Sequence, residues 1–285
     1  MEPNKKSPEP DNTAVRTALW RAIHLEIDAK PAVIEDEIGL KLIAPQEDWQ
    51  QRPDMHADFT KRLRASIVAR ARFIEDLIID QSEKGIAQYV LLGAGLDTFA
   101  QRRPDIASKL QIFEIDQPET QEWKQQRLNT LGYGIPDWLH FVSVDFEQTS
   151  WFDELIKAGF NINKPAVIAC TGVTLYLTKE AIMDTLHKIA QMAQGSVLAM
   201  TFYLPLALMD EADQQLQMIG EKGAREAGTP FVSFFPPEEV LIMAHEAGLK
   251  NSRIISTKDM KQRYFKDRTD GLTPASGEMF LICDF

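Results

Sequence analysis

The chain has 285 residues, an apolar fraction of 44% and a formal net charge of −11. It is long enough for one large α/β domain or two small ones, and it can form a full hydrophobic core. The acidic balance disfavours nucleic acid and anionic membrane as partners, because phosphate binding needs a basic surface. No apolar run approaches the ~20 residues of a membrane helix.

The N-terminal segment, residues 1–12, is polar and rich in proline. Such a composition predicts a disordered tail, and the segment lacks the apolar stretch of a signal peptide. Cys170 and Cys283 both fall in apolar runs typical of strands. Two buried thiols fit a reducing compartment, so we expect a cytoplasmic protein.

Residues 13–84 show helical periodicity without a strand-like run. Leu19, Ile23 and Ile27 recur at helical spacing, as do Ile67, Ile74 and other apolar residues before the next segment. The pattern predicts an all-helical N-terminal extension.

Strand and helix patterns alternate over 85–285. The expected strands are 88–92, 111–116, 141–145, 166–171, 196–203, 251–256 and 278–283. Helical patterns such as 179–194 and 237–247 lie between most of them. This alternation predicts one α/β domain with a seven-stranded, mostly parallel sheet and helices on both faces. The stretch 204–236 is too long for a simple crossover, and we expect a lid insertion after the fifth strand.

A glycine turn at the end of the first strand is the most informative motif. Gly93 and Gly95 follow an apolar run, and about twenty residues later the second strand ends on Glu114 and Asp116. Glycines allow a ligand to approach the backbone, and the acid can accept the hydroxyls of a ribose. The pair of glycines alone also fits a tight turn. Thr98 stands where a dinucleotide fingerprint has its third glycine, which disfavours nicotinamide and flavin cofactors.

Two further strand ends contribute polar residues to the same edge. Asp145 and Phe146 follow the third strand, and the stretch from Thr171 to Tyr176 follows the fourth. Ligands of open α/β sheets bind outside the carboxyl ends of the strands. An acid beside an aromatic ring suits adenine, so these four strand ends predict one nucleoside site.

Here the sequence resembles the leucine carboxyl methyltransferase family, in its bacterial O-methyltransferase branch. The resemblance rests on several short stretches that occur in the family's order: 69–73, 92–98, 113–119, 144–146, 172–177, 263–265 and 270–272. It implies a Rossmann-like class I methyltransferase fold and S-adenosyl-L-methionine as the cofactor, with S-adenosyl-L-homocysteine as the product.

The resemblance also implies roles for individual residues. Arg70 would bind the methionine carboxylate of the cofactor, which suits the planar guanidinium fork. The cofactor-binding set that it implies is Arg70, Gly93, Ala94, Gly95, Asp97, Glu114, Asp116, Gln117, Asp145, Phe146, Thr171 and Gly172. Thr171 is a departure, because the family's carboxyl methyltransferases usually have glutamate there. A hydroxyl can accept a hydrogen bond, but it cannot pair with the cofactor's ammonium group as a carboxylate would.

The acceptor is expected to be a small molecule or a peptide carboxylate, methylated on a carboxylate or hydroxyl oxygen. A hydroxyl would need a base or a hydrogen-bond acceptor, whereas a carboxylate would not. Tyr176 and Tyr203 are the candidate catalytic residues, with His245 and Glu211 as further contacts. No histidine lies at metal-ligand spacing, so no metal site is expected. A nicotinamide-dependent oxidoreductase and a non-catalytic cofactor-binding protein are the alternatives.

Overall fold

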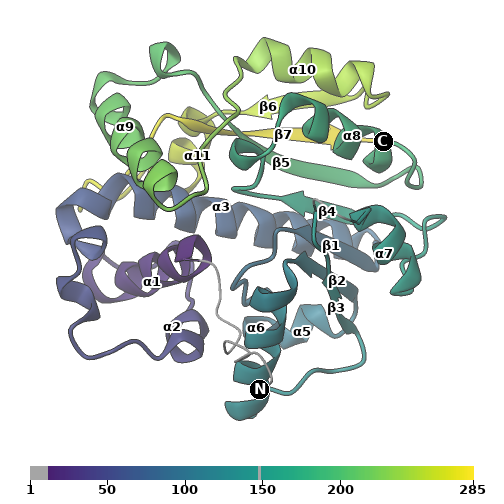
Figure 1. The fold of residues 1–285 in the computed structure, drawn as a ribbon, viewed down its shortest axis with the longest axis horizontal. Coiled ribbons are helices and arrows are strands. Elements are labelled where there is room, and N and C mark those ends of the chain that lie inside the picture. Colours follow the sequence, from purple (N-terminus) through teal and green to yellow (C-terminus); the bar gives the residue numbers. More distant parts are fainter. Residues whose placement is uncertain (1–11, 147–148) are drawn as a thin grey trace, which may run out of the picture.

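The computed structural model describes residues 12–146 and 149–285. A seven-stranded sheet crosses the molecule (Figure 1), formed by β1 (Gln88–Leu92), β2 (Gln111–Asp116), β3 (Leu139–Ser143), β4 (Val167–Cys170), β5 (Val197–Tyr203), β6 (Ser252–Ile255) and β7 (Glu278–Asp284). The strand order is β3-β2-β1-β4-β5-β7-β6. Only β7 runs antiparallel to its neighbours β5 and β6. The predicted mostly parallel α/β sheet is therefore confirmed.

The helices alternate with these strands and also precede them. They are α1 (Asn12–Ile27), α2 (Ile38–Ile43), α3 (Ala57–Glu83), α4 (Phe99–Arg102), α5 (Pro104–Ala107), α6 (Pro118–Thr130), α7 (Trp151–Lys157), α8 (Lys179–Ile189), α9 (Glu211–Glu226), α10 (Pro237–Glu246) and α11 (Thr257–Tyr264). Short 3-10 turns lie at Trp49–Gln51, Pro53–Met55, Thr174–Tyr176 and Leu206–Leu208.

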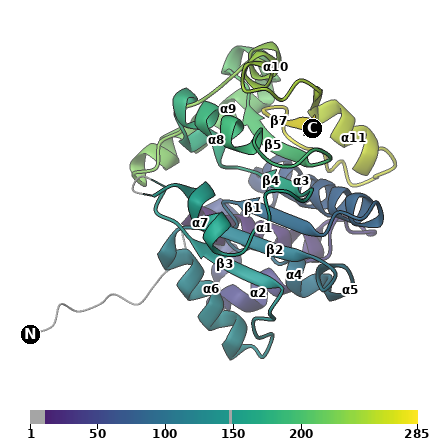
Figure 2. The same cartoon turned by 90° about the vertical axis from the view of Figure 1, so that its right-hand side faces the viewer.

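Helices cover both faces of the sheet, as the alternating pattern predicts. Val90 and Leu92 of β1 point to a core that α7, α8 and α10 complete. Tyr89 and Leu91 point to the other core, which α3, α5 and α11 help to form. All five residues of β1 are buried, because a parallel strand covered on both faces has no solvent side. Figure 2 shows the helices on either side of the strands.

The N-terminal helices form a separate layer against the start of α3. Leu19 and Ile23 of α1 pack with Trp49, Met55 and Ile67 in a small apolar cluster. Residues 1–11 of the predicted disordered tail lie outside the described residues, and Asn12 is already the first residue of α1.

The insertion after β5 contains α9 followed by an extended stretch that leads to α10. Figure 1 shows α9 and α1 on the same side of the sheet, above and below the beginning of α3. Asp213 of α9 binds Arg62 of α3 through both of its carboxylate oxygens. It also accepts hydrogen bonds from the backbone and side chain of Ser276. The insertion is thus joined to two other parts of the chain.

The third strand begins two residues earlier than its apolar run suggests. Leu139 pairs with Ile112, and the ladder ends where Ser143 pairs with Asp116. The amide of Val144 still donates to the carbonyl of Asp116, but Asp145 already lies in the following loop. Pairing with β2, which the sequence of one strand does not reveal, sets these limits.

In the described part of the chain, no helix combines the length and apolar character that a membrane crossing needs.

Candidate active site

The glycine turn joins β1 to the end of β2. The amides of Gly93 and Ala94 both donate to the carbonyl of Ile115, at 2.9 and 3.1 Å. Gly93 and Gly95 have positive φ angles of 71° and 50°, which favour glycine. A Cβ on Gly93 would lie 2.3 Å from Val173 Cγ2. The turn therefore needs glycine at position 93 both for its conformation and for its close contact with the loop after β4.

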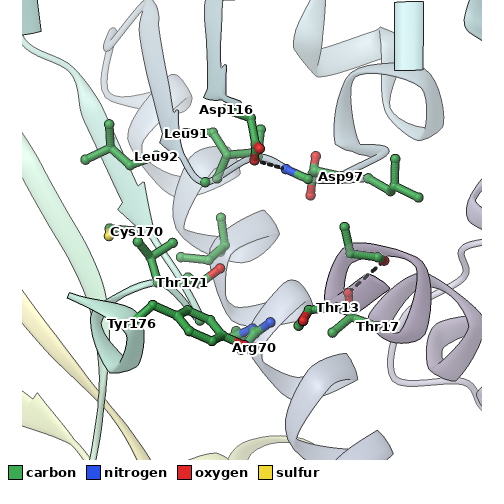
Figure 3. Close-up of a pocket in the computed structure, with 18 of the residues that line it drawn as sticks. Thr13, Thr17, Arg70, Leu91, Leu92, Asp97, Asp116, Cys170, Thr171 and Tyr176 are labelled. Carbon is green, nitrogen blue, oxygen red and sulfur yellow. Dashed lines mark hydrogen bonds between the residues drawn. The ribbon is translucent and has the colours of Figure 1, made fainter. Parts of the chain in front are cut away.

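Asp116 holds this turn from the neighbouring strand. Its Oδ2 accepts from the amide of Gly95 at 2.6 Å, and its Oδ1 accepts from the amide of Gln117 at 2.8 Å. Figure 3 shows this carboxylate at the edge of a pocket, near Asp97. A carboxylate fixed by backbone donors is well placed to accept hydrogen bonds from ribose hydroxyls.

A cavity of about 600 Å³, the first cavity, lies along the ends of β1, β2 and β4. Most of the predicted site residues line it: Arg70, Gly93, Ala94, Gly95, Asp97, Asp116, Gln117, Phe146, Thr171, Gly172 and Tyr176. Asp97 and Asp116 lie on one side, while Arg70, Thr171 and Tyr176 lie across from them (Figure 3). The fold thus brings together residues that are more than a hundred positions apart, such as Arg70 and Tyr176.

Three predicted residues are placed differently. Among the described residues, Glu114, Asp145 and Tyr203 do not line the first cavity. Glu114 is buried, and its Oε2 accepts a hydrogen bond from Lys124 Nζ of α6. Burial raises the pKa of Glu114 to about 7 despite the attraction of Lys124. Asp145 is half-buried in the loop beside Phe146. Glu114 therefore lies in the interior beside the site, where it binds α6, and it does not line the first cavity.

Arg70 lines the first cavity and lies against the loop after β4. Its Nη1 donates to Glu278 Oε1 of β7 at 2.9 Å. A Cβ on Gly172 would come within 2.8 Å of the same Nη1, so glycine leaves room for the guanidinium. Burial lowers the pKa of Arg70, but the neighbouring Glu278 and Tyr203 outweigh it and raise that pKa above its ordinary value. Arg70 therefore stays charged.

Residues of α1 also line the first cavity, and our sequence analysis missed them. Thr13, Thr17 and Arg21 line it from this helix (Figure 3 labels the two threonines). Arg21 Nη2 donates to the carbonyl of Leu96 at 2.8 Å, and Arg21 Nε donates to Asp36 at 2.6 Å. The helix is thereby fixed to the glycine turn. Helical periodicity identified the helix, but no local motif signalled its contact with a turn 75 residues away.

The first cavity fits S-adenosyl-L-methionine. Its volume lies within the range of small-molecule sites. Asp116 offers an acceptor for ribose hydroxyls, and Arg70 offers a cation for the methionine carboxylate. Gly93 and Gly95 also line the first cavity, and Phe146 offers an apolar surface for the adenine.

A second cavity of about 200 Å³ adjoins the first. The two share a wall, formed by Thr13, Thr17, Ile67, Arg70, Gly172, Tyr176 and Thr229. Tyr203 and Glu278 line only the second cavity. The ring of Tyr176 packs edge-on against Phe231, with centroids 5.4 Å apart, at the boundary. Of the two candidate catalytic tyrosines, Tyr176 therefore lies where the cavities adjoin, and Tyr203 lies in the second cavity.

Comparison with known proteins identifies the family. The family model described as leucine carboxyl methyltransferase matches residues 14–190, which is more than half of the chain. The chain belongs to the leucine carboxyl methyltransferase family. The match begins in α1, so the helix that lines the first cavity is part of the family domain.

Relatives from other bacteria agree with this family. YktD of Bacillus subtilis strain 168, provisionally named an S-adenosyl-L-methionine-dependent methyltransferase, is 28% identical over 92% of this chain and 93% of its own length. Rv0830 of Mycobacterium tuberculosis strain H37Rv, with the same provisional name, is 30% identical over 67% of this chain and 65% of its own length. Methyl transfer that depends on S-adenosyl-L-methionine is thus the supported function of this family member, and S-adenosyl-L-methionine is its cofactor.

A solved structure from Thermobifida fusca, provisionally described as a methyltransferase, has the same fold. It superposes with a TM-score of 0.61 at 17% sequence identity, and the alignment covers 97% of this chain and 95% of the other. This likeness confirms the predicted Rossmann-like methyltransferase fold.

Proposed function

We propose that this protein transfers the methyl group of S-adenosyl-L-methionine to an oxygen atom of a small-molecule acceptor. The observation that carries the proposal is the pair of adjoining cavities. The first has the residues that a nucleoside and an amino acid need, and the second shares Arg70 and Tyr176 with its lining. A cofactor in one and an acceptor in the other would meet at this shared wall.

The cofactor supplies an activated methyl group, because its sulfur is a positively charged sulfonium. The chain's own residues bind and orient. Asp116 holds the ribose, and Arg70 holds the carboxylate at the opposite end of the first cavity. The edge-on packing of Tyr176 and Phe231 narrows the junction, which excludes water and aligns the acceptor oxygen with the methyl group.

The size of the second cavity supports a small acceptor over a peptide. Its volume of about 200 Å³ falls below the usual range for drug-sized ligands. Most of its lining is apolar, with Leu63, Leu175, Met209 and Leu216 among its side chains. We therefore favour a compact, apolar or aromatic acceptor, and we place the enzyme in the cytoplasm on account of its two buried free thiols.

Thr171 favours a second candidate, a protein that binds the cofactor without catalysis. It lines the first cavity where a carboxylate would pair with the cofactor's ammonium group. One experiment addresses both candidates. S-adenosyl-L-homocysteine is titrated into the protein by calorimetry. The protein is then incubated with S-adenosyl-L-methionine, labelled on its methyl group, and a panel of small hydroxyl and carboxyl compounds. Binding together with transfer of label to oxygen supports the enzyme, and binding without transfer favours the second candidate. Absence of binding at millimolar ligand contradicts both.

A further inference from the structure

Aromatic side chains and small residues together line the second cavity. Four aromatic side chains line it: Trp20, Tyr176, Tyr203 and Phe231. The last turns of α9 and the residue that follows it contribute small residues to the same lining: Gly220, Gly223, Ala224 and Ala227. Small residues leave space beside a helix, and aromatic walls favour stacked or edge-on contacts with another ring. The combination suits a compact aromatic molecule.

The charged groups of this cavity are already neutralised within the chain. Arg70 binds Glu278, and Asp213 binds Arg62. Arg16 Nε lies 3.3 Å from Asp54 Oδ2. Among the described residues that line the second cavity, every charged side chain therefore has an oppositely charged partner. An acceptor that brings its own carboxylate would therefore have to compete with these partners for a cation.

Among these charged groups, Glu278 is the one that can accept a hydrogen bond beside the wall that the two cavities share. Its side chain is only 10% exposed, and it binds Arg70 Nη1 on the wall that the two cavities share. Tyr203 lines the same cavity, and Arg70 and Glu278 are its charged neighbours. Burial and the negative charge of Glu278 raise the pKa of Tyr203 well above its ordinary value, so Tyr203 keeps its proton and serves as a donor. Arg70 also acts only as a donor.

We propose that the second cavity takes a small aromatic acceptor with a neutral hydroxyl, and that Glu278 receives the proton of this hydroxyl during methyl transfer. This inference rests on the proposed function and specifies its acceptor. A carboxylate acceptor is disfavoured because it would lie beside the carboxylate of Glu278, and like charges repel.

The chemical step balances without a further reactant. An electron pair of the hydroxyl oxygen forms the new O–C bond, the S–C bond breaks, and its electron pair returns to sulfur. The O–H bond breaks as the oxygen gains the methyl group, because a methylated oxygen that still holds its proton is strongly acidic. Glu278 takes that proton and becomes a neutral carboxylic acid. The products are the aryl methyl ether and S-adenosyl-L-homocysteine.

The test compares two probes that share one ring. Phenol and benzoate are titrated by calorimetry into the full-length protein saturated with S-adenosyl-L-homocysteine at pH 7. We expect phenol to bind at least about tenfold more tightly than benzoate, because the benzoate carboxylate is repelled by Glu278. A tenfold difference in Kd has the same free energy as a pKa shift of about one unit. Equal binding of the two probes, tighter binding of benzoate, or no binding of either would overturn the inference. Failure of S-adenosyl-L-homocysteine itself to bind would instead contradict the proposed function.

Glu278→Gln tests the residue, and Glu246→Gln, at an exposed position of α10, is the matched control. The amide oxygen of glutamine can still accept from Arg70, so we expect the affinity for S-adenosyl-L-homocysteine to change less than about twofold. Benzoate binding should improve in Glu278→Gln alone. The ionisation of bound 4-nitrophenol, followed by its absorbance, should occur at lower pH in Glu278→Gln than in wild type. An identical ionisation pH in both proteins would refute the role of Glu278.

Discussion

At the scale of single residues, the site depends on a few atoms that bring distant segments together. Asp116 Oδ2 ties the strand end of β2 to the amide of Gly95 at 2.6 Å. Arg70 connects α3 with Glu278 of β7 and lies against Gly172. Asp116 and Arg70 each act through their own side chain, whereas Gly172 acts by having none. Single substitutions should therefore change cofactor affinity and stability separately.

Replacing Asp116 by alanine should weaken cofactor binding. The variant loses a charged hydrogen-bond acceptor, which is worth about 1–3 kcal/mol, or about a 5- to 150-fold increase in Kd. Calorimetry with S-adenosyl-L-homocysteine measures this change. Asp137→Ala, an exposed aspartate near the amino end of β3, is the control. An Asp116→Ala protein with wild-type affinity would show that this carboxylate does not contact the ligand.

Gly93→Ala should destabilise the protein more than an ordinary glycine substitution. Its Cβ would meet Val173 Cγ2 at 2.3 Å, which adds about 1–3 kcal/mol of overpacking to the strain of a positive φ angle. Gly85→Ala is a matched control, because Gly85 has φ of 94° with nothing within 4 Å of a Cβ. Only the strain of about 1–2 kcal/mol should remain there.

Urea denaturation of these two variants measures the difference. The double variant Gly93→Ala/Val173→Ala should recover the steric part of the loss, because Val173 Cγ2 is then absent. Equal destabilisation of the Gly85 and Gly93 variants would mean that the loop after β4 yields freely to the new methyl group.

At the scale of elements, α1 and α9 complete cavities that the sheet leaves open. Arg21 fixes α1 to the glycine turn through the carbonyl of Leu96. Asp213 fixes α9 to Arg62 and Ser276. We propose that the insertion covers the acceptor, and the buried Asp213 carboxylate holds α9 in its position.

Asp213→Asn should loosen α9 in a pH-dependent way. Burial raises the pKa of Asp213, but the hydrogen bonds from Arg62 and Ser276 outweigh it and lower the pKa below its ordinary value. The pKa of this carboxyl is lower in the folded protein than in the unfolded chain, where it is about 4. Its contribution to stability is therefore complete above about pH 4, and it is lost as the pH falls through the pKa of the folded state. At pH 7 the substitution should cost about 2 kcal/mol, the value of charged hydrogen bonds.

Urea midpoints at pH 7 and pH 3 check this expectation. The difference between wild type and Asp213→Asn should shrink at the lower pH, which lies below the unfolded pKa of an aspartate. Asp210→Asn is the control, since the Asp210 carboxylate is 74% exposed and lies 3.7 Å from Arg62. A difference that stays constant with pH would assign the effect to packing instead of charge.

At the scale of the whole molecule, ligand binding should stabilise the entire fold. The first cavity is lined by α1, α3 and the loops after β1, β2 and β4, so a ligand there contacts both the N-terminal layer and the sheet. A ligand at a hundred times its Kd stabilises a folded protein by about 2.7 kcal/mol. For a chain of this size we expect an increase in Tm of about 5 °C.

Thermal unfolding with S-adenosyl-L-homocysteine measures this increase, and NAD at the same concentration is the control. NAD should leave Tm unchanged, because the turn has Thr98 in place of the third glycine of a dinucleotide site. A larger shift with NAD would favour the oxidoreductase alternative.

The sequence by itself determined the sheet and one wall of the site. Periodicity located seven strands, and the glycine turn with Asp116 needed no tertiary information because strand ends of a parallel sheet meet at one edge. The limits of β3 were predicted less well, since pairing with β2 sets them. Thr98 also distinguished the turn from a dinucleotide motif.

Only the tertiary structure decided what faces that wall. Glu114 and Asp116 stand two residues apart on one strand, yet Glu114 pairs with Lys124 in the interior while Asp116 lines the first cavity. Glu278 joins Arg70 across 208 positions, and α1 reaches the glycine turn through Arg21. Such contacts are made by side chains from elements that meet only in the folded chain, and no local pattern of residues encodes them.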